Sequence, residues 1–106
     1  MITRQTIVYP LFKRGATYTN PDGSSWDPLE PGDKGYDNQF IDCFVSDGIA
    51  LGRYPNNLAL WFVGNVSGGQ LYRGGGGCDW YRAKSEFAQQ TGEHVPDTWQ
   101  ELARMT

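Results

Sequence analysis

The sequence reads Asp-Gly at positions 47 and 48, between two apolar runs. Asp-Gly in that setting is the strongest short-range signal for a β-hairpin. A two-residue turn here would oppose the pairs Ser46/Ile49, Val45/Ala50, Phe44/Leu51, Asp42/Arg53 and Ile41/Tyr54. That register puts apolar side chains beside apolar ones and one carboxylate beside one guanidinium. A helix over 37–47 is the alternative, because four apolar residues of that segment share a helical face. The hairpin is favoured.

The rest of the chain predicts short strands followed by helices. Fourteen Gly and six Pro in 106 residues indicate many turns, and the aromatic residues supply apolar area for a core. Strands are expected at 2–9, 16–19, 58–63 and 70–73, with turns at 13–15 and 64–69. Residues 78–90 change to helical spacing, and Pro96 is expected to open a second helix. We therefore predict a single α+β domain, 1–106: an antiparallel sheet of five to six short strands with two C-terminal helices packed on one face.

Two features bear on the cellular compartment. No apolar run approaches the length of a membrane span, and the first fourteen residues lack the pattern of a signal peptide. The chain has two cysteines, Cys43 and Cys78. We expect a cytoplasmic protein with two free thiols; a disulfide between them is the alternative that the sequence leaves open.

Negative charge is concentrated in one stretch. Residues 20–47 carry seven carboxylates and one cation, Lys34, which gives −7 + 1 = −6 in a chain of net charge −3. Residues 24–38 predict a long loop without regular structure. Asp22 and Asp47 suit turns, and Asp42 is expected to pair with Arg53. The other carboxylates alternate with aromatic residues and predict a partner-binding surface, made of Trp26, Asp27, Glu30, Asp33, Tyr36 and Asp37. A plain solvated loop is the alternative.

A second candidate site surrounds a run of four glycines that starts at Gly74 and ends at Gly77. Ahead of a helix, such a run can bind an anion, and the helix end would lower the pKa of Cys78. His94, the sole histidine, is the only possible base for this thiol. The run lacks the spacing of phosphate-binding loops and dinucleotide fingerprints, so a joint between strand and helix is favoured. No zinc or EF-hand spacing is present, so we expect no metal, no cofactor and no catalytic residue.

The charge balance also argues against direct binding to nucleic acid, because the basic residues are scattered and the pI is about 4.9. We predict a small acidic protein-binding module, not an enzyme, that inhibits or regulates a partner by occluding its basic surface. Machinery that handles nucleic acid has such surfaces, and phages and mobile elements encode inhibitors of this general profile. The alternatives are a ligand-binding or thiol-dependent enzyme at Cys78 and His94, and a structural subunit of an assembly. Oligomeric state is not predicted.

Overall fold

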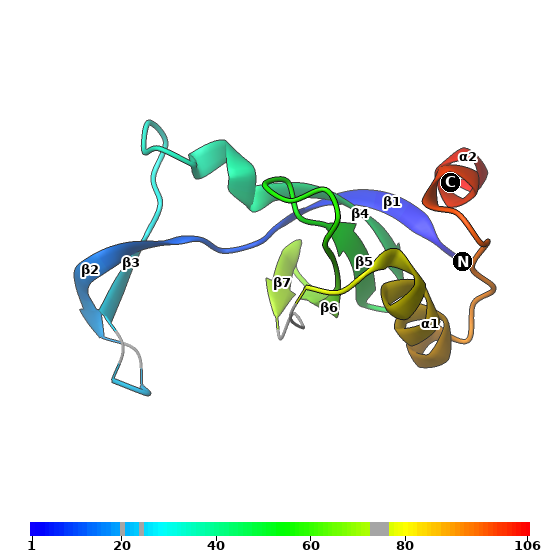
Figure 1. Cartoon of the computed structure of the whole chain (residues 1–106). Coiled ribbons are helices and arrows are strands. Elements are labelled where there is room, and N and C mark those ends of the chain that lie inside the picture. The colour runs from blue at the N-terminus through cyan, green and yellow to red at the C-terminus, as the bar shows by residue number, and fades with distance from the viewer. Residues whose placement is uncertain (20, 24, 73–76) are drawn as a thin grey trace.

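The computed structural model describes residues 1–19, 21–23, 25–72 and 77–106 (Figure 1). Five described strands close into a barrel in the order β1-β4-β5-β6-β7. Their bounds are β1 Thr3–Val8, β4 Phe40–Ser46, β5 Ile49–Arg53, β6 Trp61–Ser67 and β7 Gln70–Tyr72. Neighbouring strands are antiparallel, except that β1 and β7 meet in parallel at Val8 and Gln70. The α+β class is confirmed, but the predicted sheet is wrong in form, because this contact joins its two edges.

The hairpin at Asp47-Gly48 is confirmed. Its pairs run from Ser46/Ile49 to Cys43/Gly52 and include Phe44/Leu51, as the two-residue turn requires. Asp47 and Gly48 have φ values of 51° and 73°, the left-handed geometry that the tightest hairpin turns need. The helix considered for 37–47 is confined to a short 3-10 turn, η1 Tyr36–Gln39.

The predicted Asp42/Arg53 pair is wrong. Asp42 forms its ion pair with Arg4 of β1, the strand on the other side of β4. Arg53 instead donates its Nε–H to the Leu58 carbonyl and lies over two indole rings.

Two apolar clusters occupy the two sides of the barrel wall. The barrel core takes residues from all five strands: Ile7, Ile41, Cys43, Val45, Ala50, Phe62 and Leu71. The outer core joins the alternate strand residues to the C-terminal segment: Phe44, Leu51, Trp61, Val63, Ala83, Phe87, Val95 and Leu102. Alternation along the strands sends neighbouring side chains to opposite sides, which is why one hairpin contributes to both cores.

The helix α1 Trp80–Thr91 follows its sequence signals and contacts β5 and β6. The Asp79 carboxylate accepts from the Arg82 N–H at its start, and Gly92 ends it in the left-handed conformation. The second helix, α2 Trp99–Met105, begins later than predicted. Thr98, not Pro96, precedes its first turn, and the Thr98 hydroxyl accepts from the Glu101 N–H. Leu102 of α2 is buried in the outer core.

Two predicted strand boundaries are also displaced. The strand expected at 58–63 begins at Trp61, because the N–H groups of Ala59 and Leu60 turn back to Asn57. It then continues to Ser67 through the predicted turn, and the chain reverses over two glycines to pair Ser67 with Gln70.

A two-stranded arm, residues 12–28, extends away from the barrel (Figure 1). It consists of β2 Phe12–Thr19 and β3 Ser25–Pro28. The predicted turn at 13–15 lies inside β2, and the predicted 24–38 loop begins with β3, so both expectations are corrected. The radius of gyration is 14.7 Å, compared with about 13 Å for a compact domain of this length. The arm therefore stands apart from the main body.

Candidate functional site

Three carboxylates gather around one lysine at the base of the arm. Lys13 of β2 pairs across the arm with Asp27 of β3. Its Nζ lies 3.2 Å from Asp33 Oδ2. The pKa of Lys13 is raised, first by the hydrogen bond to Asp33 and by its charge, then by the charges of Glu30 and Asp27. One ammonium faces three carboxylates, so this group has a net charge of −2.

The turn after β3 holds Asp33 in place. Asp33 Oδ2 accepts from the Glu30 N–H at 2.7 Å, and the Asp33 N–H donates back to the Glu30 carbonyl at 3.0 Å. The pKa of Asp33 is lowered, first by the hydrogen bond from the Glu30 N–H and then by Lys13. Asp33 is thus already occupied within the chain, whereas the Glu30 and Asp37 side chains are exposed.

Two of the predicted residues, Tyr36 and Asp37, lie within η1. The Tyr36 N–H donates to the Asp33 carbonyl, which fixes the start of η1 beside the carboxylates. The Tyr36 ring packs edge-on against Phe40, with ring centroids 5.4 Å apart, and Phe40 remains 41% exposed. Asp37 lies in the same short turn. We call Asp27, Glu30, Asp33, Tyr36 and Asp37 the acidic surface.

The structure does not bring all the acidic residues of 20–47 together. Asp42 lies on the barrel wall and is neutralised by Arg4, and Asp47 lies in the β4–β5 turn. The side chain of Trp26, which we predicted to be part of the site, lies outside the described residues. The sequence analysis did not predict Lys13 as a member of this group. The signal for Lys13 is its position directly opposite Asp27, which becomes visible only once β2 is paired with β3.

The Asp33 contacts predict a pH response of the arm. Because the folded pKa lies below the ordinary value of about 3.9, ionised Asp33 stabilises the folded turn above that value, and the contribution is lost as the pH falls through the folded pKa. Carboxyl NMR titration should therefore give Asp33 a lowered pKa. In Lys13→Gln the value should rise yet stay below normal, since the Glu30 N–H remains. An ordinary pKa for Asp33 in the wild type would contradict the geometry.

The thiol site suggested by the sequence does not assemble. Cys78 precedes α1 and His94 follows it, so the twelve-residue helix lies between them, a span of about 18 Å. The Cys78 thiol donates to the Trp61 carbonyl, and burial raises its pKa, opposite to the predicted activation. Gly74, with the two glycines after it, lies outside the described residues. Cys43 is a free thiol in the barrel core, where burial and then the charge of Asp42 raise its pKa to about 12.

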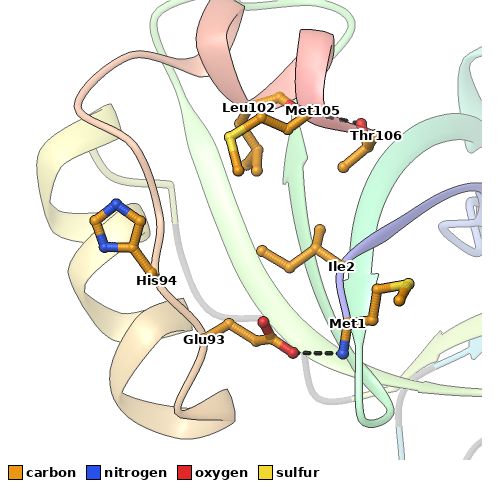
Figure 2. Close-up of a pocket in the computed structure, with 7 residues that line it drawn as sticks. All are labelled: Met1, Ile2, Glu93, His94, Leu102, Met105 and Thr106. Carbon is orange, nitrogen blue, oxygen red and sulfur yellow. Dashed lines mark hydrogen bonds and ion pairs between the residues drawn. The ribbon is translucent and has the colours of Figure 1, made fainter.

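A small pocket lies where the two ends of the described chain approach each other (Figure 2). It has a volume of about 180 Å³. Glu93 at its edge is paired with the Met1 ammonium and accepts from the Ser46 hydroxyl, and Figure 2 shows the His94 ring turned away from that pair. The Glu93 carboxylate, the charged group at the edge of this pocket, is therefore already paired within the chain.

Within the described residues, no three His, Cys, Asp or Glu side chains come close enough together to hold a metal ion. In that same part of the chain, neither helix has the length and apolar character of a membrane span. Searches against protein-family models, curated proteins and solved structures found no match to this chain.

Proposed function

We propose that the protein is a binding module whose acidic surface captures a basic surface on a partner protein. The observation that carries this proposal is the gathering of Asp27, Glu30 and Asp33 around a single cation, Lys13. Their excess charge is held at the base of an arm that stands away from the barrel (Figure 1).

Charge and exposure support this role. The charges of Asp33, Glu30 and Asp27 all act on the Lys13 ammonium, and an approaching basic protein would meet the same concentrated negative charge. Asp33 is fixed by its own contacts, which leaves the exposed Glu30 and Asp37 to pair with cations of the partner. Tyr36 and Phe40 add aromatic area beside them, the usual source of binding energy in an interface.

Binding of this kind makes or breaks no covalent bond. We propose that the module inhibits or regulates its partner by covering the basic surface, and that the partner is a protein that itself handles nucleic acid, since such proteins carry basic faces. The two free thiols are consistent with a reducing compartment, so we place the activity in the cytoplasm.

Charge reversal tests the proposal. In the double variant Glu30→Lys/Asp37→Lys the Lys13–Asp33 contact is untouched, while the two exposed charges become repulsive to a basic partner. We expect capture of a basic protein from the source cells by the tagged wild type, and capture reduced at least about tenfold by the variant. Affinity purification with quantitative mass spectrometry measures both.

The matched control is Glu86→Lys/Glu101→Lys, the same change of charge at two exposed positions on α1 and α2. It should capture as the wild type does. If both double variants lose capture of the partner equally, the overall charge of the protein governs capture, and not the acidic surface. If both capture the partner as well as the wild type does, the acidic surface takes no part in the interaction.

A second candidate function is that of a structural subunit in a larger assembly, and the arm is the feature that favours it. A two-stranded hairpin is only marginally stable when it stands alone in water, so packing against another copy would stabilise it. Light scattering after size-exclusion chromatography separates the two: a monomer supports the binding module, and a stable oligomer that dissociates on removal of residues 12–28 supports the subunit.

A further inference from the structure

A pocket of about 220 Å³ lies on the barrel wall beside α2, away from the arm. Its lining comes from four strands and α2: Arg4, Asp42, Phe44, Arg53, Trp61, Trp99 and Ala103. Pockets for drug-sized ligands occupy about 300–1,000 Å³, so this one suits a smaller molecule. Its walls consist of three aromatic side chains, three charged side chains and Ala103.

Arg53 is the central polar group of this pocket. Its Cζ lies 5.4 Å from the Trp61 ring centroid and 4.9 Å from that of Trp99, so the guanidinium rests on both indoles. Its Nε–H donates to the Leu58 carbonyl at 2.7 Å. The stacking and this hydrogen bond fix the plane of the group. Within the described chain, its two terminal nitrogens have no acceptor.

The other two charges of the pocket satisfy each other. Arg4 forms an ion pair with Asp42, and its guanidinium lies over the Phe44 ring at 5.8 Å from the centroid. Two arginines and one carboxylate leave the pocket with a net charge of +1. The uncompensated charge is that of Arg53, which is partly buried against apolar surface. Such a charge is stabilised by an anion that also brings hydrogen-bond acceptors.

We propose that this pocket binds a small monoanionic carboxylate with a flat apolar body. The carboxylate would accept two parallel hydrogen bonds from the terminal nitrogens of Arg53, a geometry that the guanidinium fork matches. The body would lie against Phe44, Trp99 and the small side chain of Ala103. One negative charge balances the pocket, and the aromatic walls favour a planar ligand. The proposal is independent of the acidic surface.

Benzoate and its neutral counterpart benzamide test the site. We expect benzoate to shift the indole N–H signals of Trp61 and Trp99 saturably in NMR titrations of the whole chain. The backbone N–H signal of Tyr36 serves as an internal reference, because this group donates to the Asp33 carbonyl and Tyr36 does not line the pocket. Benzamide should bind at least tenfold more weakly. Equal affinities, or the absence of a saturable shift with benzoate, would overturn the proposal.

Two variants then locate the binding. Arg53→Met keeps an unbranched apolar stem but removes the guanidinium and its charge, and should weaken benzoate binding at least tenfold. Ala103→Leu keeps all three charges but fills the pocket from α2, and should weaken it similarly, so the test survives if Arg53→Met does not fold. Arg82→Met, at an exposed position of α1, is the control and should bind as the wild type does. Unchanged binding in Ala103→Leu would overturn the assignment.

Discussion

Replacing Gly52 by alanine should destabilise the protein by about 1–3 kcal/mol, the usual cost of overpacking a filled core. A Cβ at this position would lie 2.3 Å from Phe62 Cζ and 2.7 Å from Cys43 Sγ. Both neighbours are almost fully buried in the barrel core and cannot swing into solvent. The substitution therefore forces the wall of the barrel to move.

Urea unfolding measures the loss, and a double-mutant cycle identifies its cause. Phe62→Leu alone removes buried atoms and costs stability, but in the Gly52→Ala background it also relieves the contact. The two changes together should thus cost less than the sum of the single changes, with a coupling of about 1 kcal/mol or more. Simple additivity, or a neutral Gly52→Ala, would contradict the packing of Phe62 and Cys43 against Gly52 between β4 and β6.

Phe87→Ala should cost about 3–5 kcal/mol, the largest effect we expect from one substitution in α1. Phe87 is fully buried in the outer core, where α1 meets the barrel wall, and truncation leaves a cavity there. A domain of this size has about 5–15 kcal/mol of stability in all, so the variant should lose a large part of it.

The control for Phe87→Ala is Tyr81→Ala on the same helix. Tyr81 is 69% exposed, so its removal should change the free energy of unfolding by no more than about 0.5 kcal/mol. Thermal or urea unfolding of both variants tests whether α1 covers the barrel through this face. Similar small effects of the two changes would show that α1 is not docked as described.

Local chemistry decided what the sequence could predict. The β4–β5 hairpin follows from Asp47-Gly48, and α1 from the cap at Asp79 and the glycine at its end; each signal lies within the element that it controls. The start of α2 is also specified locally, by Thr98 three residues before Glu101, but the prediction rested on Pro96 alone and placed the start too early.

Contacts between distant segments could not be predicted in the same way. Closure of the barrel depends on β1 reaching β7, and no pattern in either strand specifies that neighbour. The Asp42/Arg53 prediction failed for this reason, because β1 supplies Arg4 instead. Residues 25–28 predict a loop because they end at Pro28 and turn-forming residues surround them, but pairing with β2 makes them the strand β3.

The sequence predicted which carboxylates belong to the candidate site, but not how they are arranged in space. The acidic run indicated which carboxylates to consider, and the structure keeps Asp27, Glu30 and Asp33 together. Lys13 and the arm that carries it were missed, because they depend on the pairing of β2 with β3. The pocket at Arg53 was missed too, since its lining is drawn from five elements.

Hydrogen–deuterium exchange on the complex with the captured partner tests the acidic surface most directly. If Glu30, Asp37 and their neighbours form the interface, the partner should slow amide exchange in residues 25–39 and leave α1 and α2 unchanged. The Glu30→Lys/Asp37→Lys variant should show no such protection. Protection confined to the helices, with exchange in 25–39 unaffected, would contradict binding through the arm.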